Sequence, residues 1–153
     1  MAAGNWIMYD AAKELVGGGI DFENATLKMM LTDDGHTPSR SGHALVSDIS
    51  GDEIANGNGY TTGGETLANV SYGQTSGTAE LDCDPVEWTA SSAGLANIQY
   101  AHVYWEDDRA SPMVPRLIAY CQVDSAPVDV ADTQKFRVTP HANGVLRLSG
   151  MTS

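Results

Sequence analysis

The stretch that decides the fold reads Ile-Gln-Tyr-Ala-His-Val-Tyr-Trp and occupies residues 98–105. In a β-strand, successive side chains point to opposite faces of the sheet. Apolar or aromatic side chains occupy both faces here: Ile98, Tyr100 and Tyr104 on one, and Ala101, Val103 and Trp105 on the other. A strand that is apolar on both faces belongs inside a sandwich or under a subunit interface. We therefore expect this strand to be completely buried.

Similar short runs surround this stretch and predict further strands. Each run is bounded by glycine, proline or a cluster of Asp, Asn and Ser, which interrupt strands. The predicted strands are residues 25–32, 67–72, 78–83, 86–89, 116–123, 134–139 and 145–149. Short strands at this spacing are typical of antiparallel folds. We predict a mainly β fold, an antiparallel β-sandwich or barrel with one N-terminal α-helix.

The N-terminal helix is predicted over residues 5–16. Asn5 can accept a hydrogen bond from the free amides of a first helical turn. Ile7, Ala11 and Leu15 recur at helical spacing. The three glycines that follow can end the helix, because glycine adopts the left-handed cap conformation without steric cost. We expect this helix to cover one side of a sheet.

A long polar loop, residues 33–59, follows the first predicted strand. It carries the turn sequences Asp-Asp-Gly at 33–35 and Asn-Gly-Asn-Gly at 56–59. A loop of this length in a small domain usually serves a function or contacts a partner. Residues 47–54 are expected to form a short turn of helix within it. The loop is long enough to reach a neighbouring subunit.

The last two predicted strands carry the basic residues that can cluster. In residues 134–139, apolar and basic side chains alternate, so Lys135 and Arg137 are expected to face outward. A turn is expected to join this strand to residues 145–149 as a hairpin. Lys135, Arg137 and Arg147 would then form the main basic patch of the molecule.

The composition is that of a single globular domain without a nucleic-acid or membrane partner. The chain has 153 residues, 42% of them hydrophobic, and a formal net charge of −12. A chain of about 150 residues can bury ~70% of its unfolded surface, so residues 1–153 are expected to form one domain. The eight Lys and Arg residues are scattered and cannot neutralise a phosphate backbone against this acidic field. No apolar run approaches the roughly 20 residues that cross a bilayer, and no secretory signal is visible.

The sequence carries no recognised catalytic motif, and we expect no enzymatic activity, cofactor or metal. A GxSxG nucleophile elbow is absent, and the glycines of residues 57–64 lack the spacing of a nucleotide-binding loop. His36 and His43 share the polar loop, but a metal site there would require the loop to fold back on itself. His102 is expected to be a core or interface residue with a satisfied ring.

Cys83 and Cys121 are expected to be reduced and mostly buried thiols. They show no CxxC spacing, and no histidine stands near them at a metal-ligand spacing. Because no secretory signal is visible, we favour free thiols over a disulfide.

The order of several short motifs resembles a group of small virion proteins of tailed bacteriophages. The first half contributes Tyr-Asp-Ala-Ala-Lys (9–13), Gly-Ile-Asp (19–21), Thr-Leu-Lys (26–28), His-Thr-Pro (36–38), Ser-Asp-Ile-Ser (47–50) and Gly-Asn-Gly-Tyr-Thr-Thr-Gly-Gly-Glu-Thr-Leu (57–67). The second half contributes Val-Glu-Trp-Thr-Ala (86–90), Tyr-Ala-His-Val-Tyr (100–104), Leu-Ile-Ala-Tyr (117–120) and Asn-Gly-Val-Leu (143–146). The resemblance covers about residues 9–148 and depends on the order and spacing of the motifs together. It implies a structural component of the virion, head or tail, with no catalytic residues to transfer.

Two functions from different classes follow from this resemblance. The first is a capsid decoration (cement) protein, made in the host cytoplasm, which stabilises the head by binding between capsomers of the major capsid protein. We expect it to be a homotrimer on the head surface, because a capsid offers threefold positions. The alternative is a tail or tail-fibre domain that recognises host surface glycan. An enzyme acting on cell-wall sugar is suggested only by the acidic residues 82–87 and 106–108, which are expected to be solvated turns.

Aromatic residues and the predicted basic patch supply the candidate interface. Aromatic side chains in a chain with few charges are typical of protein interfaces as well as of cores. The candidate interface residues are Trp6, Tyr9, Tyr60, Tyr100, Tyr104, Trp105, Lys135, Arg137 and Arg147.

Overall fold

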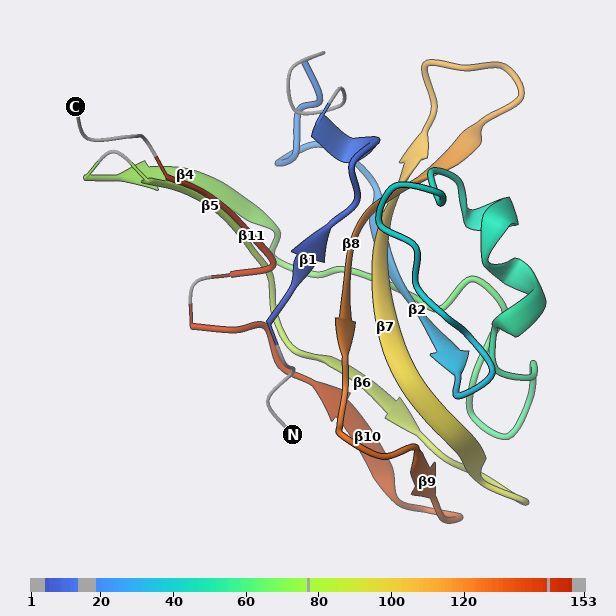
Figure 1. Ribbon diagram of the computed structural model, residues 1–153. Helices are drawn as coiled ribbons and strands as arrows, with labels where there is room; N and C mark the ends of the chain where they lie inside the picture. The colour runs from blue at the N-terminus through green and yellow to red at the C-terminus, as the bar shows by residue number, and fades with distance from the viewer. Residues whose placement is uncertain (1–4, 14–18, 77, 143, 150–153) are drawn as a thin grey trace.

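The computed structural model describes residues 5–13, 19–76, 78–142 and 144–149, and this part of the chain is mainly β (Figure 1). Its strands are β1 (Ile7–Met8), β2 (Leu27–Asp33), β3 (Glu65–Thr66), β4 (Ser71–Thr75), β5 (Thr78–Asp82), β6 (Val86–Thr89), β7 (Leu95–Asp107), β8 (Val114–Gln122), β9 (Val128–Val130), β10 (Lys135–Val138) and β11 (Leu146–Ser149). Two 3-10 turns, η1 (Val46–Asp48) and η2 (Ser50–Asp52), lie between β2 and β3. All these strand pairs are antiparallel, which confirms the predicted mainly β, antiparallel fold.

The largest sheet has six strands, with β7 at its centre. The strand order is β1-β8-β7-β2-β3, and β9 also pairs with β7. The predicted burial of β7 on both faces is confirmed, since Ala101, His102 and Val103 are all 0% exposed. Ile98, predicted on the face of Tyr100, instead packs in the main core, where the register of β7 is irregular.

One face of the large sheet packs against the smaller sheets. The two-stranded sheet pairs β6 with β10, and the three-stranded sheet has the order β11-β5-β4. Met29, Val103 and Ile118 from the large sheet meet Trp88 and Phe136 from β6 and β10 in the main core. Along β6 and β10, buried apolar and exposed polar side chains alternate, as predicted for the last of these strands.

The predicted hairpin of the last two strands is wrong. β10 pairs with β6, whereas β11 pairs with β5 in another sheet. In these registers Arg137 lies opposite Glu87, and Arg147 lies opposite Glu80. Opposite charges across a strand pair are stabilising, whereas a hairpin of the two basic strands would have placed like charges together. The predicted basic patch of Lys135, Arg137 and Arg147 is therefore divided between two sheets.

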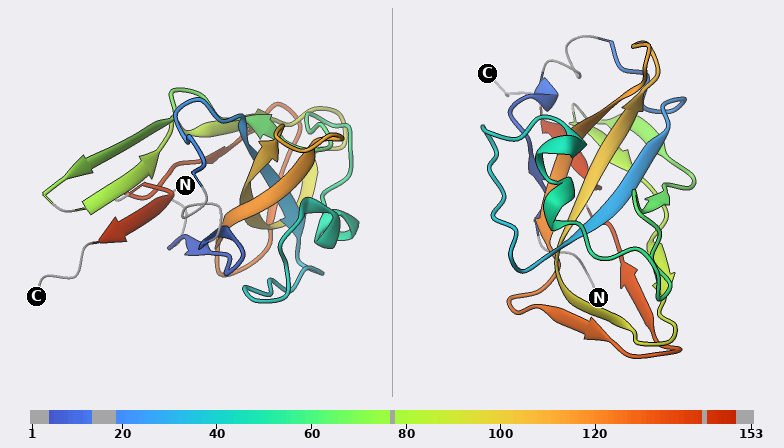
Figure 2. Two further views of the ribbon diagram at one scale, coloured as in Figure 1. Left: turned by 90° about the horizontal axis from the view of Figure 1, so that it is seen from above. Right: turned by 90° about the vertical axis from the view of Figure 1, so that its right-hand side faces the viewer.

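The covering segment, residues 34–59, lies across the other face of the large sheet up to η2 and then passes the β2 edge, where Ile54 joins the main core (Figure 2). Its Ile49 is 1% exposed and packs with Met30, Tyr104 and Leu117 in a second buried cluster. The helical turn predicted within this segment is confirmed as η1 and η2. The chain itself thus covers the second apolar face of β7, which the sequence alone left to another sheet or another subunit.

The helix predicted over residues 5–16 is wrong for its first residues. β1 is extended and pairs with β8 at the edge of the large sheet. Residues 10 and 11 then form a turn, residues 12 and 13 are helical, and residues 14–16 lie outside the part that the structure describes. The edge of β8 offers unpaired N–H and C=O groups, and satisfying them outweighs a helical periodicity of apolar residues.

Cys83 and Cys121 are free and buried, which confirms the prediction of reduced thiols. Burial raises the pKa of both thiols to about 12, and nearby carboxylates add to the effect at Cys83. The thiolate is the nucleophilic form of cysteine, and at neutral pH these side chains hold almost none of it. Both cysteines therefore serve the packing of the core.

Candidate assembly interface

Most of the aromatic residues predicted at an interface are buried within the chain. Tyr9, Tyr60, Tyr104 and Trp105 are 0%, 2%, 3% and 4% exposed. Burial of the Tyr60 hydroxyl is compensated by hydrogen bonds, because it accepts from a backbone N–H of β2 and donates to Glu53. In this conformation these rings stabilise the core and cannot contact a partner.

The remaining predicted residues reach the surface to different extents. Trp6 and Tyr100 are half-buried, while Lys135 and Arg137 are exposed on β10. The Lys135 ammonium forms an ion pair with a carboxylate of β6 at 2.6 Å. Arg147 is part of β11, but its side chain lies outside what the structure describes. An interface role for these residues stays a prediction.

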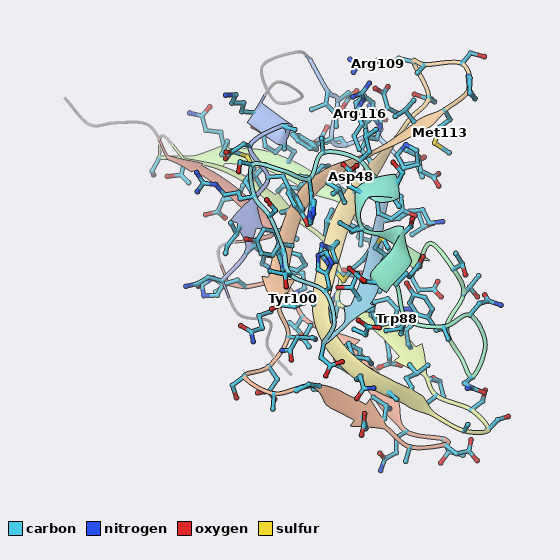
Figure 3. The ribbon with its side chains drawn as sticks, turned by 45° about the vertical axis from the view of Figure 1, so that its right-hand side comes forward. Asp48, Trp88, Tyr100, Arg109, Met113 and Arg116 are labelled. Atoms are coloured by element: carbon cyan, nitrogen blue, oxygen red, sulfur yellow. The ribbon has the colours of Figure 1, made fainter. Side chains whose placement is uncertain are left out.

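Large exposed apolar side chains are few. In the described ranges they are Ile7, which is 40% exposed, and Met113, which is 44% exposed. Figure 3 shows Met113 at the same end of the molecule as Arg109 and Arg116. Obligate interfaces are rich in apolar side chains. A partner of the described surface must therefore bind mainly through polar side chains and backbone groups.

The projecting sheet, β4–β5–β11, extends away from the rest of the molecule (Figures 1 and 2). β5 is paired on both sides, whereas β4 and β11 are each paired on one side only. Every second residue of an edge strand turns its N–H and C=O groups away from its neighbour. No other described strand pairs with the outer side of β4 or β11. The projecting sheet therefore presents two open edges.

The β4 edge has none of the usual protection against strand addition. Natural edge strands are blunted by lysine, proline, bulges or a covering element. β4 reads Ser-Tyr-Gly-Gln-Thr, and its register with β5 is continuous from Ser71↔Asp82 to Thr75↔Thr78. On a chain of net charge −12, an uncharged strand is also where another strand meets least repulsion.

The base of the projecting sheet is fixed in the main core. Leu81 on β5 is 1% exposed, and Leu146 on β11 is 6% exposed. Tyr72 on β4 packs on Phe22, with 5.0 Å between the ring centroids. The sheet is therefore held at its base while its outer edges stay open.

The acidic clusters that could have indicated an enzyme have separate partners. Asp84 accepts a hydrogen bond of 2.6 Å from the Asn69 amide. Glu87 accepts one of 2.6 Å from Lys135 on the neighbouring strand. Glycoside hydrolysis needs two carboxyl groups that flank one bond of the substrate. These carboxylates instead stabilise a turn and a strand pair.

His102 has both ring nitrogens within hydrogen-bonding distance of hydroxyl groups, as predicted for a satisfied core residue. Nδ1 lies 2.8 Å from the Tyr9 hydroxyl, and Nε2 lies 2.9 Å from the Thr32 hydroxyl. Within the described ranges, no three His, Cys, Asp or Glu side chains are arranged to hold a metal ion. His102 is therefore a structural residue of the sheet.

Asp107 joins two arginines at the end of β7. Its carboxylate accepts from Arg109 Nε at 2.9 Å and from Arg116 Nε at 2.8 Å. The Asp107 side chain is 3% exposed, while Arg109 and Arg116 are 52% and 38% exposed. The hydrogen bonds from Arg109, and then those from Arg116, hold the pKa of Asp107 at about 2. This cluster fixes the start of the loop between β7 and β8.

We expect Asp107→Asn to lower stability at neutral pH. The folded pKa of Asp107 lies below its ordinary value, so its ionised form stabilises the fold above about pH 4, and this contribution is lost as the pH falls toward about 2. Urea unfolding of both proteins should show a difference at about pH 7 that shrinks in acid. A difference that is the same at both ends of this range would contradict the assigned role.

A pocket of about 230 Å³ lies beside Trp105 and is also lined by Asp21, Asn24 and Arg109. Binding of a glycan by tryptophan requires an exposed indole face in a concave site. The Trp105 indole is 4% exposed, and the Arg109 guanidinium lies 4.5 Å from the ring centroid. Trp88 is 1% exposed. Neither indole offers a surface for a sugar ring.

No protein-family model, no curated protein and no solved structure matches this chain. The resemblance to small virion proteins therefore depends on the sequence motifs alone. Among the described residues, no helix has the length and apolar character needed to cross a membrane.

Proposed function

We propose that this chain is a non-enzymatic structural protein of a tailed-bacteriophage virion, a decoration or cement protein on the outside of the head. The observation that carries the proposal is the projecting sheet with its two open edges. A decoration protein must bind between neighbouring capsomers, and strand addition at a sheet edge gives directional contacts through main-chain groups. The resemblance of the sequence motifs to small virion proteins supports the same function.

The two edges also support self-association into a ring. β4 and β11 are different strands at opposite sides of one sheet, so β4 of one copy can meet β11 of the next. Contacts between two different surfaces close into a ring when the rotation between copies permits it. Three copies match the threefold positions of a capsid. We propose a homotrimer joined through the projecting sheets, with the major capsid protein as the second partner.

The charge of the chain supports a position away from packaged DNA. A net charge of −12 opposes contact with a phosphate backbone. The alternative, a glycan-binding tail or tail-fibre domain, loses support because Trp88 and Trp105 are buried. The protein would be made in the host cytoplasm and would act on the head surface.

The substitution Gln74→Lys tests self-association through the β4 edge. Gln74 is exposed on β4, and lysine on an edge strand disfavours strand addition. Gln74 lies opposite Ala79, so the added charge has no carboxylate opposite it on β5, whereas Arg147 on β11 lies opposite Glu80. Added lysine reduces the net negative charge, so general repulsion between copies cannot explain a loss of assembly. The matched control is Gln122→Lys, which makes the same change at the exposed end of β8.

Sedimentation of the full chain should separate these proteins by mass. We expect the wild type and Gln122→Lys to sediment at three times the 16.2 kDa of one chain, and Gln74→Lys to sediment as a monomer. A circular dichroism spectrum unchanged by the substitution would show that the fold is intact. A wild type that is monomeric, or a folded Gln74→Lys that remains a trimer, would overturn assembly through this edge.

A further inference from the structure

Three histidine rings lie together beneath the covering segment. His36 and His43 belong to this segment, and His102 belongs to β7. The centroid of the His36 ring lies 5.5 Å from that of His43 and 5.1 Å from that of His102. His36 is 3% exposed, His102 is 0% exposed and His43 is half-buried. The segment has thus folded back on itself, as His36 and His43 would need in order to meet.

Only one of the two ring nitrogens of His36 has a hydrogen-bond partner among the described residues. Its Nδ1 lies 2.9 Å from Asp52 Oδ2 and must carry a proton, because a carboxylate only accepts. The other nitrogen, Nε2, is buried and has no hydrogen-bond partner among the described residues. In the neutral ring Nε2 is an acceptor, whereas in the charged ring it becomes a buried donor without an acceptor. A buried donor without an acceptor is unfavourable.

The hydrogen-bond partners of His43 and His102 are a backbone N–H and hydroxyl groups. The Nδ1 of His43 accepts a hydrogen bond of 3.3 Å from the backbone N–H of Ser39, and protonation of Nδ1 would remove that acceptor. His102 contacts two hydroxyl groups and no carboxylate. Burial, and then the neighbouring His36 and His43, hold the pKa of His102 well below its ordinary value. Positive charge on more than one ring would be strongly unfavourable.

Other groups face the cluster from every element packed around it. The rings of Tyr9, Tyr100 and Tyr120 lie within 6.4 Å of the His102 ring, centroid to centroid, and remain uncharged in weak acid. Two carboxylates oppose the effect of protonation. Asp52 contacts His36 but is 46% exposed, so solvent screens its charge. Asp48 interacts with His43 but accepts hydrogen bonds from two backbone N–H groups of its own segment.

We propose that the covering segment is an acid-released strap, closed over the buried ring of His102 with His36 and His43 beside it, and opened when the His102 ring gains a proton. An open strap would uncover Met30, Tyr104 and Leu117, which now pack against Ile49. Acid would therefore expose an apolar face on a molecule that otherwise shows few exposed apolar side chains. The proposal does not depend on the proposed function.

The direction of the pH dependence follows from linkage. In an open strap His102 would bind a proton with the ordinary affinity of histidine, near pH ~6.5, whereas the closed strap keeps this ring neutral. The closed state is therefore most stable relative to the open state above this pH, and this stability decreases as the pH falls below it. One ring kept neutral makes opening roughly 30-fold more favourable at a pH about 1.5 units below the ordinary histidine pKa.

Hydrogen exchange of the full chain, followed by mass spectrometry at about pH 7.5 and 5.0, tests the strap. After correction for the intrinsic pH dependence of exchange, protection of residues 34–54 should fall roughly 30-fold in acid. Protection of β6 and β10 should stay unchanged. Equal protection of the strap at both pH values, or an equal loss throughout the molecule, would overturn the proposal.

Variants locate the response in the cluster. His43→Gln should weaken the pH response of residues 34–54, because it removes one of the groups whose charge disfavours protonation of His102. His141→Gln is the matched control, since His141 lies outside the cluster. If His43→Gln folds and responds to pH like the wild type, the cluster is not the sensor. If His43→Gln does not fold, the hydrogen exchange of the wild type at the two pH values still tests the proposal.

Discussion

Replacing Gly64 by alanine is expected to lower the free energy of unfolding by about 2–5 kcal/mol. Gly64 has φ +72°, and a Cβ there would overlap the carbonyl oxygen of Met29 on β2. A residue with a side chain in the left-handed region costs about 1–2 kcal/mol, and overpacking costs typically a further 1–3 kcal/mol. The backbone cannot yield easily, because β3 pairs with β2 immediately after Gly64. Urea unfolding, followed by tryptophan fluorescence, measures the loss.

Gly57→Ala separates the two causes of this loss. Gly57 also has a positive φ, of +109°, but no atom lies within 4 Å of the position that its Cβ would take. This control should therefore lose only the conformational part, about 1–2 kcal/mol. Equal losses in Gly57→Ala and Gly64→Ala would show that the overlap between the new Cβ and the Met29 carbonyl oxygen does not contribute to the loss.

Trp88→Ala is expected to cost about 3–5 kcal/mol of unfolding free energy, the range measured for buried aromatic residues. Trp88 is 1% exposed, and its ring lies 6.3 Å from Tyr60 and 6.1 Å from Phe136, measured between centroids. It joins the small β6–β10 sheet to the large sheet, so its loss leaves a cavity between the two layers. Thermal and urea unfolding of the variant measure the effect.

Trp88→Phe distinguishes the two contributions of this side chain. The Trp88 Nε1–H is buried without a hydrogen-bond partner among the described residues, and its desolvation is unfavourable. Phenylalanine keeps most of the aromatic contact and removes this N–H. We expect a loss of less than about 2 kcal/mol. A loss as large as that of Trp88→Ala would show that the packing depends on the full indole.

The strands could be predicted because their signals are local. β6 and β10 alternate apolar and polar residues, and β7 is apolar on both faces, so strand type and inward faces follow from the order of the residues. The pairing of β10 with β6 instead of β11 could not be predicted, because it depends on matching across distant parts of the chain. β1 was predicted as helix for the same reason, since its partner β8 lies more than a hundred residues away.

The candidate interface could be predicted only in small part. The sequence predicts Tyr9, Tyr60 and Tyr104 as interface residues, but the covering segment and the main core bury them. Residue type alone does not distinguish an aromatic core residue from an aromatic interface residue. The open edge of β4 was missed, because an edge exists only once the sheet order is known. Its sequence signal is a five-residue strand without charge in an acidic chain.

The histidine cluster could not be predicted from the sequence either. His36 and His43 were seen as neighbours, but His102 lies far away in sequence and joins them only through the folded segment. Ile49 and Ile54, two apolar residues in a polar loop, are the signal that this loop packs on the sheet. Two features suggested an apolar subunit interface: the apolar faces of residues 98–105 and the long loop of residues 33–59. Because the loop packs on this strand within one chain, neither feature requires a partner, and the projecting sheet becomes the main support for assembly.

The number of copies of this chain in a purified virion tests the central proposal most directly. Quantitative mass spectrometry can measure it as a ratio to the major capsid protein. A trimeric decoration protein at the threefold positions of a head is expected in on the order of hundreds of copies. A few to tens of copies would instead place the chain in the tail and contradict a role in stabilising the head.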